Sequence, residues 1–101
     1  MTLDDYQRAA ARTMNASLTR EERLMDAAAG MAEEAGEVLA LVRKHLYQQR
    51  ALDPARLREE LGDALWCLAV AADAAGFTLE EVATSNVDKL AARHPGGFKT
   101  R

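Results

Sequence analysis

The sequence has a single cysteine, no excess of basic residues and no long apolar run. Cys67 has no partner in the chain, which excludes an intrachain disulfide and suits a reducing compartment. The chain carries 13 basic and 16 acidic residues, a balance that argues against a polymeric nucleic acid as partner. The longest apolar run, residues 64–72, is too short to cross a bilayer as a helix, and the acidic start does not resemble a signal peptide. We therefore expect a cytoplasmic protein without a membrane partner.

The length and hydrophobic content of the chain predict one domain, residues 1–101. At 101 residues and 49% hydrophobic content, the chain has room for one small folded unit and is too apolar for a disordered segment. Many of its apolar residues are alanines, which bury little area each, and a small domain buries a smaller fraction of its surface than a large one. We expect a homodimer or homotetramer to supply the missing core.

Alternating apolar and polar runs typical of strands are also missing, so we predict an all-α fold. Four segments carry helix start signals, and the predicted helices span about residues 2–15, 19–49, 53–75 and 78–93. We predict a four-helix bundle around an antiparallel hairpin formed by the two central helices. Gly30 and Gly36 lie inside the second helix, where a missing side chain would let another helix approach closely.

Two acidic pairs, Glu34 with Glu37 and Glu60 with Asp63, lie in apolar, alanine-rich helical stretches. Residues three apart on a helix are neighbours, with Cβ atoms about 5–6 Å apart, so each pair directs two carboxylates the same way. Two such pairs facing each other would form a cation site. Carboxylate oxygens select hard cations, and a site that leaves positions for water and phosphate oxygens suits Mg²⁺ or Mn²⁺ better than zinc.

Two other interpretations of the acidic pairs are weighed against this metal site. A carboxylate-bridged di-iron bundle uses Glu-x-x-His pairs, and neither His45 nor His94 belongs to such a pair. Alternatively, the carboxylates are surface groups that pair with arginines such as Arg56 and Arg58. Two acidic pairs on consecutive helices with apolar flanks favour the metal site over this second interpretation.

Three segments of the chain, in this order, carry a resemblance to a known family. They are Glu33-Glu34-Ala35-Gly36-Glu37, Glu59-Glu60-Leu61-Gly62-Asp63 and Ser85-Asn86-Val87-Asp88-Lys89-Leu90-Ala91-Ala92-Arg93-His94-Pro95. Together they resemble the MazG-like branch of the all-α nucleoside triphosphate pyrophosphohydrolases. The resemblance implies a helical domain that cleaves a (deoxy)nucleoside triphosphate between the α and β phosphates with Mg²⁺, releasing the monophosphate and pyrophosphate. The resemblance also implies that four residues bind the metal ion: Glu34, Glu37, Glu60 and Asp63.

Further site residues are expected beside the acidic pairs and on the last helix. Glu33 and Glu59 adjoin the ligands and are candidate catalytic bases or supporting groups. On the last helix, three polar residues at positions i, i+3 and i+7 share one face, where they could hold phosphate oxygens or sugar hydroxyls; the alternative is an ordinary polar face near a helix end. These residues are Asn86, Lys89 and Arg93.

Two more residues near the acidic pairs are assigned less specifically. Lys44 follows the first pair and is a further candidate phosphate contact. Trp66 follows the second pair by three residues and either belongs to the core or borders a base pocket.

Three alternative functions stay open at this point. One is the related phosphoribosyl-ATP pyrophosphohydrolase reaction, which needs the same metal-triphosphate chemistry. The others are a non-catalytic nucleotide or metal sensor and a helical interaction module whose acidic pairs bind a basic partner. Motif spacing does not reveal which base or sugar the site prefers.

Overall fold

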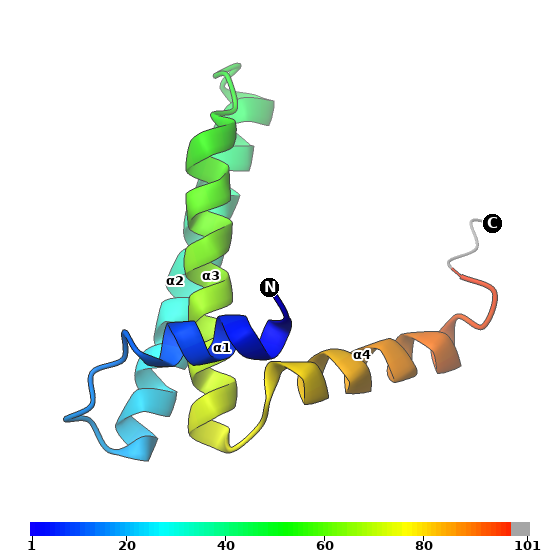
Figure 1. Cartoon of the computed structure of the whole chain (residues 1–101). Coiled ribbons are helices and arrows are strands. Elements are labelled where there is room, and N and C mark those ends of the chain that lie inside the picture. The colour runs from blue at the N-terminus through cyan, green and yellow to red at the C-terminus, as the bar shows by residue number, and fades with distance from the viewer. Residues whose placement is uncertain (98–101) are drawn as a thin grey trace.

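The computed structural model describes residues 1–97 and contains four helices in that range (Figure 1). They are α1 (Leu3–Ala11), α2 (Arg20–Tyr47), α3 (Pro54–Ala75) and α4 (Leu79–Arg93). The all-α prediction is confirmed, since no strand occurs among these residues. Residues 98–101, which the single-domain prediction includes, lie outside the described residues.

Each helix begins at the residue that the sequence predicts, because a side chain there binds exposed backbone amides. The Thr2 and Thr19 hydroxyls accept hydrogen bonds from the amides of Asp5 and Glu22, whose carboxylates bind the cap amides in return. The Asp53 carboxylate caps α3 by accepting from the amides of Ala55 and Arg56, and the Thr78 hydroxyl caps α4 by accepting from the Glu81 amide. α3 ends at Gly76, whose φ of 86° is readily available to glycine.

The end of α1 differs from the prediction, because the helix stops at Ala11 rather than near Asn15. The Thr13 hydroxyl donates to the Ala10 carbonyl at 2.8 Å, and the Thr13 amide donates to the same oxygen at 3.0 Å. The indole nitrogen of Trp66 in turn donates to the Thr13 hydroxyl at 2.7 Å. These bonds replace the regular helical pattern, so a distant residue contributes to ending α1.

Helices α2 and α3 form the predicted antiparallel hairpin (Figure 1). We call residues 20–31 with 66–75 its packed half, and residues 38–47 with 54–65 its open half. All buried residues of the hairpin lie in the packed half: Ala27, Cys67, Ala69, Val70, Ala72 and Ala74. A Cβ added at Gly30 would lie 2.8 Å from the Cys67 sulfur, so the predicted close approach is confirmed there, whereas Gly36 has no neighbour within 4 Å.

Polar contacts fix the corner between α3 and α4 against α1 and α2. The buried Gln7 amide donates to the Phe77 carbonyl at 2.9 Å and to the Ala69 carbonyl at 3.4 Å. Its oxygen accepts from the Leu79 amide at 2.9 Å. The Arg20 guanidinium donates to the Ala74 carbonyl at 2.6 Å. Backbone groups at this corner therefore find partners from α1 and from the start of α2.

Helix α4 points away from the hairpin (Figure 1) and bends by 101° relative to α3. It packs against α1 and α3 and makes no contact with α2. Among the described residues, no single helix is long and apolar enough to cross a membrane. By length and composition alone, α3 and α4 would suffice together, but they form a bent pair.

The chain is more extended than a compact monomer of its size. Its radius of gyration is 16.3 Å, whereas about 13 Å is typical for 100 residues. Its accessible surface of 7699 Å² exceeds by roughly 2,000 Å² the 5,600 Å² or so that is typical of a folded monomer of 11.0 kDa. Much of this excess is apolar, since Leu39, Leu46, Leu61 and Val87 are all more than half exposed.

Candidate metal centre

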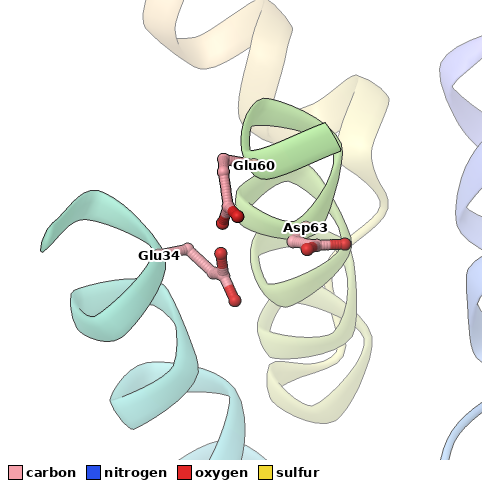
Figure 2. A group of neighbouring side chains, drawn as sticks. All are labelled: Glu34, Glu60 and Asp63. Carbon is pink, nitrogen blue, oxygen red and sulfur yellow. The ribbon is translucent and has the colours of Figure 1, made fainter. Parts of the chain in front are cut away.

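Three acidic side chains come close together where α2 faces α3, and Figure 2 shows the Glu34 and Glu60 carboxyl groups between the two helices and Asp63 beside them on α3. Glu34 comes from α2, and Glu60 and Asp63 come from α3. One oxygen from each lies within 4.8 Å of the others, and the Glu34 and Glu60 carboxyl groups point toward each other. The antiparallel hairpin thus brings together residues that are 26 or more positions apart in sequence.

Glu34 is the most strongly perturbed member of this group. Its pKa is raised to about 7, first because it hydrogen bonds with the Glu60 carboxyl, which requires a proton on one partner, and then by partial burial. The negative charges of Glu60, Asp63 and Glu37 raise it further. Its Oε2 atom is shielded from water, and no group outside the three carboxylates donates a hydrogen bond to it among residues 1–97. The group therefore holds more negative charge than the surrounding protein neutralises.

Pairing with arginine does not account for these carboxylates. In the described part of the chain the one ion pair joins Arg8 and Asp5, which lie on α1. Arg56 and Arg58 are exposed and form no ion pair with the group. A cation remains the simplest way to satisfy the shielded Glu34 oxygen. The all-oxygen donor set and the partly open position fit a hard divalent ion.

The other predicted residues near the acidic pairs are exposed. Glu37 is not part of the three-residue group, although its charge acts on Glu34. Glu33 and Glu59 adjoin the ligands in sequence, and both side chains face solvent. Lys44 lies ten residues beyond Glu34, which on a helix is about 15 Å. The structure therefore groups three of the four predicted ligands and does not bring Lys44 to them.

The predicted substrate-binding residues of α4 lie apart from the carboxylates of their own chain. Asn86 and Lys89 line a hollow on α4 together with Phe77 and Val82. Arg93 is the exposed last residue of the helix. Because α4 does not contact α2, these three residues and Glu34 are not brought together within one chain.

Near the centre, Cys67 and Trp66 have different environments. Cys67 is buried, and its pKa is raised first by that burial and then by the charges of Glu34 and Asp63, which disfavours a reactive thiolate. Trp66 is half buried and packs against the core. It also lines a cavity, together with Arg23 and Asp26. Sequence reasoning missed Arg23 and Asp26, although their spacing with Gly30 and Glu33 places all four on one face of α2.

The fold and the centre define an all-helical protein with a carboxylate cluster between two antiparallel helices. The family model of the MazG nucleotide pyrophosphohydrolase domain matches residues 22–98, which include α3, α4 and nearly all of α2. The chain therefore belongs to the MazG family, and the predicted resemblance is confirmed. No curated protein and no solved structure matches the chain in these comparisons. Family membership indicates a metal-dependent nucleotide pyrophosphohydrolase.

Proposed function

We propose that this protein hydrolyses a (deoxy)nucleoside triphosphate to the monophosphate and pyrophosphate with Mg²⁺, in the cytoplasm. The observation that carries this proposal is the grouping of Glu34, Glu60 and Asp63 within 4.8 Å in a chain of the MazG family. A triphosphate is itself highly anionic, so a cluster of carboxylates is compatible with it only as the holder of divalent cations. Mn²⁺, which prefers the same ligands, is expected to substitute.

The residues of the centre have separate tasks in this reaction. Glu34, Glu60 and Asp63 hold the cation, and Glu37 adds negative charge beside them. When bound, Mg²⁺ supplies polarisation of the phosphoryl oxygens and neutralises charge on the leaving pyrophosphate. Glu33 or Glu59 accepts the proton of the attacking water, since both are exposed and adjoin the ligands.

A second copy of the chain completes the assembly in this proposal, as a homodimer or a dimer of dimers. The roughly 2,000 Å² of excess surface per chain is comparable with what obligate dimers bury. The exposed leucines of the open half supply an apolar face for it. Because Asn86, Lys89 and Arg93 do not reach the carboxylates of their own chain, they contact the triphosphate held by the partner copy.

The main test incubates the purified protein with a panel of ribo- and deoxyribonucleoside triphosphates and Mg²⁺ and separates the products by ion-exchange chromatography. The expected products are the monophosphate and pyrophosphate in equal amounts. Phosphoribosyl-ATP is included, and turnover of that compound alone would replace the proposed substrate class. Release of inorganic phosphate, or nucleotide binding without turnover, would contradict the proposed reaction. An assay with EDTA serves as the matched control for the metal.

A further inference from the structure

The packed half of the hairpin has a cavity of about 340 Å³. This cavity lies next to the carboxylates. Its walls come from the α1–α2 connection, from α2 and from α3. Among the residues that line it are Met14, Arg23, Asp26, Glu33, Trp66 and Val70. Cavities from about 300 Å³ upward are large enough to hold small ligands.

The cavity and the carboxylates are neighbours along both helices. Gly30 lines the cavity one helical turn before Glu34, and Trp66 lines it one turn after Asp63. One to two turns correspond to about 5–11 Å along the hairpin. A single ligand that places phosphates at the carboxylates could therefore extend its other end into the cavity.

Trp66 gives the cavity an aromatic wall in a fixed orientation. Its indole nitrogen is held by the Thr13 hydroxyl at 2.7 Å, so the ring is tied to the end of α1. Val70 and Met14 add apolar surface beside it. Planar rings of ligands stack on such surfaces, and base–aromatic stacking is largely independent of base identity.

Arg23 and Asp26 add one hydrogen-bond donor and one acceptor that the protein itself leaves unused. The Nε atom of Arg23 is shielded from water and has no partner among residues 1–97. Asp26 lines the same cavity one turn further along α2 and forms no ion pair within the described residues. A shielded, unpaired guanidinium nitrogen is unfavourable, so a ligand that offers an acceptor there is stabilised.

We propose that this cavity binds the base of the nucleotide and favours bases with a ring carbonyl beside an N–H group, namely guanine, uracil or thymine, over adenine. Arg23 donates to the carbonyl oxygen, Asp26 accepts from the adjacent N–H or amino group, and Trp66 stacks on the ring. Adenine has no carbonyl to accept from Arg23. This inference rests on the proposed function, which places the phosphates of the substrate at the carboxylates and so directs its base toward the cavity.

The first experiment uses Trp66 as a reporter, since it is the only tryptophan of the chain. Fluorescence is titrated with GMP, CMP, UMP and AMP in the presence of Mg²⁺, and ribose 5-phosphate serves as a control without a base. GMP or UMP is expected to quench the signal with an affinity about tenfold above that of AMP, and CMP, which has no N–H beside its carbonyl, is expected to bind more weakly than the better of these two. Equal affinities for all four nucleotides, or equal quenching by ribose 5-phosphate, would overturn the inference.

The second experiment compares Arg23→Met with Arg56→Met, an exposed position at the other end of the hairpin. Arg23→Met is expected to remove the roughly tenfold preference over AMP, whereas Arg56→Met keeps it. Asp26→Ala removes the acceptor and provides an independent variant with the same expected loss, and circular dichroism checks that each variant is folded. Retained preference in both cavity variants would overturn the inference.

The two proposals can fail separately. Base-selective quenching that Arg23→Met abolishes supports the cavity even if no triphosphate is hydrolysed. Hydrolysis with unchanged base preference in the cavity variants supports the proposed reaction and removes the base from this cavity. A change of oligomeric state in both Arg23→Met and Asp26→Ala, with preference intact, would show that a second copy occupies the cavity instead.

Discussion

The packed and open halves of the α2–α3 hairpin are built from the same two helices but have different surroundings. Every buried residue of the hairpin lies in the packed half, where small side chains and Gly30 let the helices approach closely. In the open half, Leu39, Leu46 and Leu61 are more than half exposed. The carboxylates lie near the boundary between the two halves. One half therefore maintains the fold of the chain, and the other half has the exposed apolar surface that we propose a second copy covers.

The largest expected effect comes from removing a carboxylate at this boundary. Glu60→Gln should lower kcat/KM by more than about a hundredfold, because groups that merely support metal ligands already account for ten- to a hundredfold losses. Glu80→Gln, an exposed position on α4, is the matched control and should keep its activity. Steady-state pyrophosphate release measures both variants. Equal activity in Glu60→Gln and the wild type would remove Glu60 from the site.

The second-largest expected effect is on self-association of the chain through the open half. Leu39→Glu places a charge on the surface proposed for the second copy, which should weaken self-association by roughly ten- to a hundredfold. Met25→Glu changes a similarly exposed residue in the packed half and should leave the assembly intact. Sedimentation velocity compares the two variants. A monomeric wild type, or dissociation by Met25→Glu alone, would contradict the assignment of the open half.

Two glycines on α2 compare the packing inside the packed half, at Gly30, with the packing beside the carboxylates, at Gly36. Gly30→Ala should destabilise the fold by about 1–3 kcal/mol, because its Cβ would lie 2.8 Å from the Cys67 sulfur. Gly36→Ala meets no neighbour within 4 Å and should stabilise the helix by about 0.5–1 kcal/mol. Urea unfolding measures both changes. Adding Cys67→Ala should relieve much of the Gly30→Ala loss, and failure to do so would contradict the assigned clash.

The smallest expected effect is the pH dependence of metal binding. Because the pKa of Glu34 is raised to about 7, the carboxyl is protonated below that pH and must lose its proton to bind a cation. Mg²⁺ affinity should therefore rise by up to about tenfold per pH unit below pH 7 and level off above it. Calorimetry in two buffers of different ionisation enthalpy should detect proton release at pH 6. Its absence there would contradict the shared proton.

The same raised pKa predicts how stability changes without metal. A carboxyl whose pKa is higher in the folded state than in the unfolded state binds more protons when folded, so its contribution weakens as pH rises. For Glu34 this decline falls between its ordinary value of 4.5 and about 7. Thermal unfolding of the metal-free protein should show this decline, and Glu34→Gln should remove it.

The sequence was sufficient for the features that depend on local chemistry. All four helix starts and the glycine end of α3 were predictable, because caps act on amides within three residues. The grouping of Glu34, Glu60 and Asp63 followed from helical spacing and an antiparallel hairpin. The assignment of these residues as metal ligands remains a prediction.

Features that depend on distant contacts were not accessible from the sequence. The end of α1 involves Trp66 and Thr13, which are 53 residues apart. The direction of α4, and with it the separation of Lys89 from the carboxylates, depends on the 101° bend after Gly76. The cavity at Arg23 and Asp26 exists only where the α1–α2 connection packs beside α3. Spacing within one helix contains none of this information.

The contacts of Gln7 have a consequence for how the chain opens. Its side-chain oxygen accepts from the buried Leu79 amide, 72 residues away, while its amide nitrogen donates to the Phe77 carbonyl. The Leu79 amide can therefore exchange its hydrogen with solvent only when α1 detaches from the α3–α4 corner. Exchange at this single amide reports the free energy of a partial opening in which α1 is released while the hairpin stays intact.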